Sequence, residues 1–194
     1  DIANMPKEDQ PGWYDAHYAE VDRLFGMPDG RGLTAVPRVK GERLIPLKTH
    51  YTRKPGGQKK ARTTLGGHRM KKGIDFQETF STGVRATTVC MFVSSAVERN
   101  DVLTGGDIDQ AYLHALKMLK TRGTMPEGYE DVINSIEHCV EVGNLYGGPD
   151  AGRVFYMHLR DWLKKYGFKQ SEWDPCLYTY TRVIDGHTLR VCVY

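Results

Sequence analysis

Two aspartates near the middle of the chain, Asp107 and Asp109, are the residues whose type and spacing most clearly suggest chemistry. They are two positions apart in an apolar stretch, so in a strand both carboxylates would point to the same face. A charged group among apolar neighbours is costly unless it is paired or bound to a metal. Mg²⁺ is typically held by one or two carboxylates together with substrate phosphates. The pair therefore suits a Mg²⁺-dependent phosphoryl transferase, although spacing alone slightly favours a simpler role, the capping of a turn into a following helix.

Positive charge is concentrated in one part of the sequence. Residues 38–72 contain 12 lysines and arginines and a single acid, Glu42, although the net charge of the 194-residue chain is only +3. A basic block of this density usually faces phosphate groups. Nucleic acid or a nucleotide is therefore favoured as its partner over the alternative, a solvated surface loop.

Several sequence features that are absent limit the class of protein. No run of about 18 apolar residues is available to span a membrane, and the polar start of the chain gives no sign of secretion. The widely spaced cysteines predict reduced thiols in an intracellular protein, and neither a zinc ribbon nor a disulfide framework. They are Cys90, Cys139, Cys176 and Cys192. Because the chain begins with Asp1 and ends inside an apolar segment, we expect an excised piece.

The periodicity of apolar residues predicts an α+β fold with an antiparallel sheet packed against helices on one side. Helices are expected over residues 13–25, 84–99 and 150–166. Strands are expected over residues 33–36, 43–51, 102–108, 177–183 and 188–194. The turn at Pro55-Gly56-Gly57 suggests a hairpin that presents the basic block, and Asp185-Gly186 suggests the turn of a second hairpin. Asp150 is a suitable N-cap for the last helix.

A series of short motifs, in a fixed order, resembles the reverse transcriptase domain of Ty1/copia retroelements. The motifs are Lys60-Ala61-Arg62, Gly73-Ile74-Asp75-Phe76-Gln77-Glu78-Thr79-Phe80-Ser81, Val84-Arg85-Ala86-Thr87-Thr88-Val89, Asp107-Ile108-Asp109-Gln110-Ala111-Tyr112-Leu113, Met125-Pro126-Glu127-Gly128-Tyr129, Leu145-Tyr146-Gly147, Gly167-Phe168 and Asp174-Pro175-Cys176-Leu177-Tyr178. Each is weak alone, but so many in the same order form a specific signal that extends from about Tyr14 to Tyr194.

The resemblance implies the right-hand architecture of a polymerase, with fingers at residues 13–100 and a partial palm at residues 101–194. It implies RNA-directed DNA polymerisation by two-metal nucleotidyl transfer with Mg²⁺. The partners would be an RNA/DNA template–primer, a dNTP, and the rest of a Pol polyprotein with ribonuclease H and integrase. Such a protein would act in the cytoplasm, within a virus-like particle, or in the nucleus.

The same resemblance assigns roles to individual residues. Asp107 would be the catalytic, metal-binding carboxylate, and the backbone oxygen of Ile108 would lie near the same metal. Tyr112 would lie under the incoming sugar, unless it is an ordinary core tyrosine. Lys60 and Arg62 would hold the triphosphate, unless they contact only a phosphate backbone or solvent. The implied nucleotide-binding set is Lys60, Arg62, Ile108, Asp109, Ala111, Tyr112 and Asp150.

The sequence departs from the family pattern at three places, and these departures bear on the expected polymerase activity. The family continues into Y-V-D-D, whose aspartates complete the metal site, whereas this sequence stops at Tyr194. We therefore expect the chain alone to be inactive as a polymerase. Asp150 stands where the family has a glutamine that touches the nucleotide, and a carboxylate there would repel a triphosphate. The basic stretch at residues 63–68 also differs from that of the family.

Two competing functions follow from these departures. The chain could be a non-catalytic or remnant reverse-transcriptase fold that binds RNA or a protein partner. It could also be a purely structural subunit of a larger assembly. Nucleic-acid affinity that falls with salt is expected of a polymerase and of a binding module. Mg²⁺-dependent nucleotide binding that is lost in Asp107→Ala is expected only of the polymerase, and the structural subunit would bind no nucleic acid.

Overall fold

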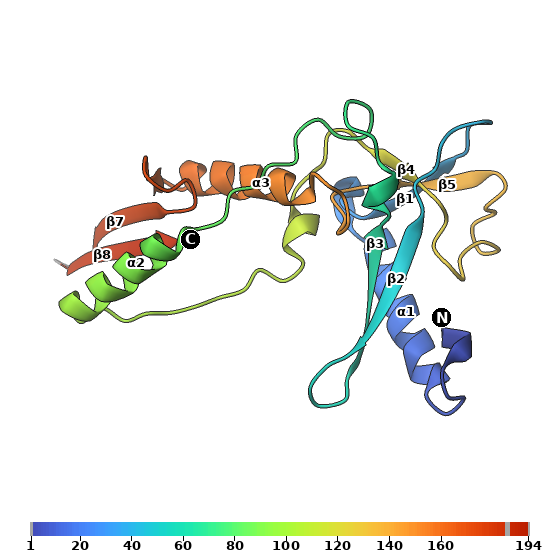
Figure 1. Cartoon of the computed structure of the whole chain (residues 1–194), viewed down its shortest axis with the longest axis horizontal. Helices are drawn as coiled ribbons and strands as arrows, with labels where there is room; N and C mark the ends of the chain where they lie inside the picture. The colour runs from blue at the N-terminus through green and yellow to red at the C-terminus, as the bar shows by residue number, and fades with distance from the viewer. Residues whose placement is uncertain (1, 185–186, 194) are drawn as a thin grey trace. The chain divides into compact units, whose positions relative to one another are not determined.

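The computed structural model describes residues 2–184 and 187–193, which form a mixed α+β fold. Within these residues there are three α-helices and three small antiparallel sheets (Figure 1). The chain divides into two compact units. Unit 1 contains the residues up to Thr79 together with Tyr112–Phe155, and unit 2 contains Phe80–Ala111 and the residues from Tyr156 onward.

Unit 1 is built from one long helix, a hairpin and a three-stranded sheet. Helix α1 (Gln10–Phe25) lies along the hairpin of β2 (Leu47–Arg53) and β3 (Lys59–Leu65), as Figure 1 shows. In the separate sheet, β5 (His138–Val142) is the central strand between β1 (Leu33–Pro37) and β4 (Thr121–Gly123). Short 3-10 turns occur at Ile2–Asn4, Pro28–Gly30, Gly67–Arg69 and Ala111–His114.

The core of unit 1 joins α1 to both sheets. Val21 and Leu24 on α1 are completely buried, as are Val140 and Val142 on β5. The other buried members of this cluster are Leu33, Ile45, Leu65, Met70, Leu113, Met125, Tyr129 and Leu145. Burial of an aliphatic side chain of this size contributes roughly 1.5–3 kcal/mol, so this cluster holds the hairpin and the sheet in a fixed arrangement within the unit.

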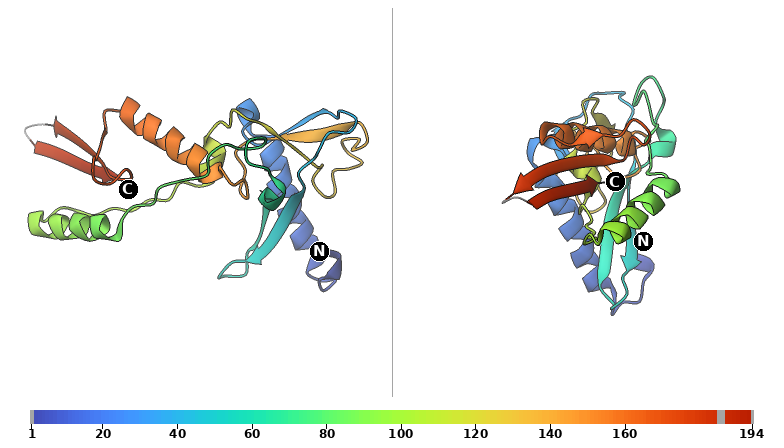
Figure 2. Two further views of the ribbon diagram at one scale, coloured as in Figure 1. Left: turned by 45° about the horizontal axis from the view of Figure 1, so that its top comes forward. Right: turned by 90° about the vertical axis from the view of Figure 1, so that its left-hand side faces the viewer.

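Unit 2 contains α2 (Ala86–Arg99), most of α3 (Ala151–Lys165) and a sheet in the order β6–β7–β8. The strands are β6 (Lys169–Gln170), β7 (Tyr178–Ile184) and β8 (His187–Val193), and Figure 2 shows β7 and β8 as a twisted hairpin. Helix α2 ends at Asn100, which adopts a left-handed conformation (φ 56°). Asparagine tolerates this conformation better than most residues.

The three predicted helices and both predicted hairpins are confirmed, with ends that differ by a few residues. The turn predicted at Asp185-Gly186 lies outside the described residues. The three strands β4, β5 and β6 were not predicted, and three small sheets replace the single sheet that was expected. β4 and β6 have only three and two residues, too few to show an alternating pattern.

The strand predicted over residues 102–108 is wrong. This segment has no regular secondary structure, and its apolar Val102 is 88% exposed. None of the described strands pairs with it. A strand needs a hydrogen-bonding neighbour, and the adjacent Gly105 and Gly106 further weaken a preference for extended structure.

Two further expectations concern the cysteines and membrane-spanning helices. Cys139 is buried and Cys176 half-buried, while Cys90 is exposed, and all three are free thiols. The side chain of Cys192 lies outside the described part of the structure. Among the described helices, none is both long and apolar enough to cross a membrane.

Candidate nucleotide-binding site

The hairpin in unit 1 gives the two basic residues of the Lys60-Ala61-Arg62 motif a common face. Side chains alternate along a strand, so Lys60 and Arg62 share one face of β3, and Ala61 and Thr63 share the other. The second face is buried against α1, where the backbone N–H of Thr63 donates to Glu20 Oε1 at 3.1 Å. Lys60 and Arg62 are therefore directed away from α1.

Cross-strand partners extend this outward face. His50 lies opposite Arg62, and Thr52 lies opposite Lys60. Lys48 and His50 are exposed. Within the described part of the chain, the side chain of Lys60 makes no hydrogen bond or ion pair. The outward face of the hairpin thus carries positive charge that is available to an anion.

Arg62 is held over a small aromatic cluster. Its guanidinium carbon lies 4.7 Å from the centre of the Tyr146 ring, a cation–π geometry. The Tyr146 ring is 4.8 Å from that of Tyr112, and Tyr112 is 6.0 Å from the ring of Phe155. The structure therefore brings together two residues of the predicted set, Arg62 and Tyr112, through Tyr146.

The backbone beside this cluster is fixed by Asn144, which is buried. Its side-chain amide donates to the carbonyl oxygen of Tyr112 at 2.9 Å and to that of Ala151 at 3.1 Å. Ala151 is the first residue of α3. One side chain therefore ties the start of α3 to the residue predicted to lie under the sugar.

Asp150 immediately precedes α3 and forms a buried ion pair. Its Oδ1 is 2.8 Å from Nζ of Lys117, and the exposed fractions of the two residues are 7% and 3%. The pair has no net charge, so the expected repulsion of a triphosphate by Asp150 is opposed by an adjacent cation. Its carboxylate accepts a hydrogen bond from Lys117, while its backbone oxygen accepts one from Val154 N.

The remaining predicted residues belong to unit 2. Asp107, Ile108 and Asp109 are exposed and lie in a segment without helix or strand, and Ala111 begins the turn Ala111–His114. Among the residues that the structure describes, no three acidic, histidine or cysteine side chains are grouped to hold a metal ion. These residues alone do not supply the carboxylates of a two-metal site.

Sequence reasoning missed three residues of this arrangement. Tyr146 lies within a recognised motif, but its contact with Arg62 joins residues 84 positions apart in the sequence. Lys117 and Asn144 are ordinary polar residues in the sequence. Only their burial, 3% and 1% exposed, distinguishes them.

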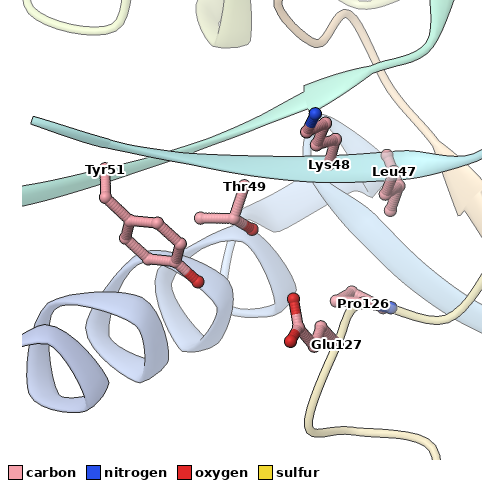
Figure 3. Close-up of a pocket in the computed structure, with 6 residues that line it drawn as sticks. All are labelled: Leu47, Lys48, Thr49, Tyr51, Pro126 and Glu127. Carbon is pink, nitrogen blue, oxygen red and sulfur yellow. The ribbon is translucent and has the colours of Figure 1, made fainter. Parts of the chain in front are cut away.

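A separate pocket of about 330 Å³ lies on the inner side of the hairpin and was not predicted. Figure 3 shows Tyr51 and Thr49 on β2 facing the loop that carries Pro126 and Glu127. The Tyr51 hydroxyl is 3.0 Å from Nδ1 of buried His17, whose Nε2 is 2.8 Å from the Glu127 carbonyl oxygen. Burial, together with the charge of Glu127, raises the pKa of Tyr51 to about 12. This network ties α1, β2 and the loop together.

Sequence comparison identifies the class of protein that carries these features. Residues 32–194 match the family described as reverse transcriptase (RNA-dependent DNA polymerase), and the chain belongs to this family. It is 31% identical, over 72% of its length, to the retrovirus-related Pol polyprotein from transposon TNT 1-94 of Nicotiana tabacum. It is 29% identical, over 63% of its length, to the corresponding polyprotein from transposon RE1 of Arabidopsis thaliana.

The relatives are far longer than this chain. The match spans 11% of the tobacco polyprotein and 8% of the Arabidopsis one. A second Arabidopsis polyprotein, from transposon RE2, is 28% identical over 63% of the chain. The predicted resemblance to copia-type reverse transcriptases is thus confirmed. No solved structure matches the chain significantly.

Proposed function

We propose that this chain supplies the nucleotide-binding part of an RNA-directed DNA polymerase encoded by a copia-type retrotransposon. Its substrates would be a dNTP and a primer paired with template RNA, and its partners the rest of a Pol polyprotein, including ribonuclease H and integrase. Residues 13–100 would act as fingers and residues 101–194 as part of the palm. Family membership supports the reaction, and the contacts around Arg62 support the site.

The observation that carries the proposal is the position of Arg62. Its guanidinium is held over Tyr146, on the same face of β3 as Lys60, and Tyr146 in turn packs on Tyr112. A guanidinium presents several donors in a planar fork that fits phosphate oxygens. A triphosphate bound at Arg62 and Lys60 would place its sugar near the Tyr112 ring. The neutral pair of Lys117 and Asp150 would leave the positive potential of the hairpin undiminished.

Divalent metal remains part of the proposal because the family uses Mg²⁺. Asp107 and the carbonyl oxygen of Ile108 would contribute ligands, but further carboxylates are needed to complete a two-metal site. When bound, Mg²⁺ would assist attack by the primer hydroxyl and neutralise the leaving pyrophosphate. Lys60, Arg62 and Tyr112 would bind and orient the nucleotide, and this orientation is the major part of catalysis in phosphoryl transfer.

The test is the affinity of the chain for dTTP in the presence of Mg²⁺, measured by isothermal titration calorimetry. Loss of a hydrogen-bonded contact to a charged group costs about 1.5–3 kcal/mol, so we expect Arg62→Ala to weaken binding by about tenfold to a hundredfold. Lys40→Ala is the matched control, because Lys40 is an exposed cation of the same basic block. An equal effect of both substitutions would show only a general attraction between charges and would contradict the assigned site.

A second candidate function is a non-catalytic module that binds RNA. It is favoured by one observation, namely that Asp107 lies in an exposed, irregular segment without grouped metal-ligating side chains in the described structure. Such a module would bind single-stranded RNA through the outward face of the hairpin and would show no Mg²⁺-dependent affinity for dTTP. The calorimetric experiment therefore separates the two functions.

A further inference from the structure

We infer that Tyr146 is a positioning residue, which holds the Arg62 guanidinium in the orientation that binds a triphosphate. The inference rests on the proposed function, because it assigns Arg62 to the nucleotide. It adds a residue for which neither the sequence motifs nor the family match gives a role. Three observations support it: the attachment of the Tyr146 backbone, the location of its ring, and the exposure of Arg62.

The backbone of Tyr146 is attached to the end of β3. Its carbonyl oxygen accepts a hydrogen bond of 2.7 Å from Leu65 N. The next residue, Gly147, has φ of +88°, and a Cβ there would lie only 2.2 Å from the Leu65 carbonyl oxygen. Only glycine permits both this conformation and this approach of two backbones. Tyr146 is therefore attached to the end of β3, the strand that carries Arg62. Arg62 lies three residues before this end.

Two side chains lie close to the ring of Tyr146. Arg62 lies 4.7 Å from its centre, and Tyr112 lies 4.8 Å away. Tyr112 is itself held by Asn144 through its backbone oxygen and packs against Phe155. The Tyr146 ring therefore packs on a Tyr112 side chain that is itself held in place, and its face is available to Arg62 in a fixed orientation.

Arg62 needs such a support because it is exposed and has no ion pair within the described residues. A long, free arginine loses conformational freedom when it binds a ligand, and this loss weakens the affinity. Contact with an aromatic face restricts the guanidinium before the ligand arrives, yet leaves its N–H donors available at the edge. Tyr146 thus lowers the entropic cost of binding a triphosphate without contacting it.

The inference predicts how binding responds to the electronic character of the ring. Tyr146 is replaced by phenylalanine and by its mono-, di- and trifluorinated forms. The dissociation constant of Mg²⁺–dTTP is then measured for each full-length chain. Fluorine withdraws charge from the ring face with little change in shape. We expect Tyr146→Phe to bind within about twofold of the natural chain, and affinity to fall stepwise with fluorination, by about fivefold to tenfold in total. Equal affinity across the series would overturn the inference.

A second measurement shows whether Tyr146 acts through Arg62. Tyr146→Leu is compared in the natural chain and in the Arg62→Ala background. We expect it to weaken dTTP binding in the first case and to have no added effect in the second, because the group that it positions is absent. Additive losses would indicate a general packing role and would contradict the inference.

The two experiments also separate this inference from the proposed function. If Arg62→Ala weakens dTTP binding but the fluorinated series is flat, only the role of Tyr146 fails. If Arg62→Ala leaves binding unchanged, Arg62 does not hold the triphosphate and both fail. Thermal unfolding of each variant identifies any loss of folded protein. The fluorinated series remains informative even if Tyr146→Leu does not fold, because its members keep the shape of the ring.

Discussion

At the scale of single residues, Lys117 and Asp150, which immediately precedes α3, form a buried ion pair. Each side chain is nearly inaccessible to water, and Nζ of Lys117 lies 2.8 Å from Oδ1 of Asp150. Breaking a buried pair by removing one partner usually costs more than replacing both, because an uncompensated charge remains. The dependence of Lys117 and Asp150 on each other can therefore be tested by measuring the free energy of unfolding.

We predict that Lys117→Met lowers the free energy of unfolding by about 3–5 kcal/mol, because it leaves the Asp150 carboxylate buried and unpaired. Urea unfolding followed by circular dichroism measures the change. Lys117→Met combined with Asp150→Asn should recover part of the loss, since the buried charge is then absent. A double variant that is less stable than Lys117→Met would mean that the two residues contribute independently of each other.

At the scale of elements, Asp174 shows how distant segments of unit 2 define the start of a helix. Helix α2 has Arg85 at its N-cap position, and Arg85 offers no side-chain cap. Instead, the Asp174 carboxylate accepts hydrogen bonds from Arg85 N at 3.0 Å and from Thr88 Oγ1 at 2.6 Å. Backbone N–H groups at a helix start need such acceptors. The Asp174-Pro175-Cys176 motif therefore has a structural role in capping α2.

The stability of unit 2 should depend on the ionisation of Asp174. The Thr88 hydroxyl, followed by the N–H groups of Arg85 and Cys176, lowers the pKa of this carboxyl below its ordinary value. A lowered folded-state pKa gives stability that is fully present above the ordinary aspartate range, near pH 4, and is lost as the pH falls through the folded-state pKa.

We predict that Asp174→Asn lowers the melting temperature at pH 7 and flattens its decline as the pH falls below about 4. Differential scanning calorimetry over this range measures both effects. Glu172→Gln is the control, because Glu172 is an exposed carboxylate two residues away. If the control flattens the pH profile as much as Asp174→Asn does, acid destabilisation does not arise from the helix cap.

The same elements show what sequence could predict. Helix α1 and the β2–β3 hairpin were predictable because their apolar spacing and glycine turn are local signals. The strand at residues 102–108 was wrong, because an apolar run predicts burial and says nothing of whether a partner strand is present. The Asp174 cap could not be predicted, since it joins residues 86 or more positions apart in the sequence.

The candidate site was only partly predictable, because several of its contacts join residues that are distant in the sequence. Motif resemblance selected Arg62 and Tyr112, and the structure brings them to a common aromatic cluster. Tyr146 lay within a motif without an assigned function. Lys117 and Asn144 became candidates only through burial and hydrogen bonds, which depend on the tertiary fold.

At the scale of the whole molecule, the two compact units carry different parts of the proposed chemistry. Unit 1 holds the basic hairpin, Arg62 and Tyr112, whereas Asp107 belongs to unit 2. The proposed polymerase reaction uses both cations and Mg²⁺ held on carboxylates to bind the triphosphate. From the proposed function we predict that the affinity of the chain for a nucleotide depends on Asp107 only when Mg²⁺ is present.

The most direct test is the dissociation constant of dTTP for the natural chain and for Asp107→Ala, each measured with Mg²⁺ and with EDTA. Asp107 is exposed, so its substitution should leave the melting temperature unchanged. We predict that Mg²⁺ strengthens binding to the natural chain and that Asp107→Ala removes this gain while keeping the weaker, metal-independent affinity. The same response to Mg²⁺ in both proteins would contradict a role for Asp107 in nucleotide binding and would favour the RNA-binding module.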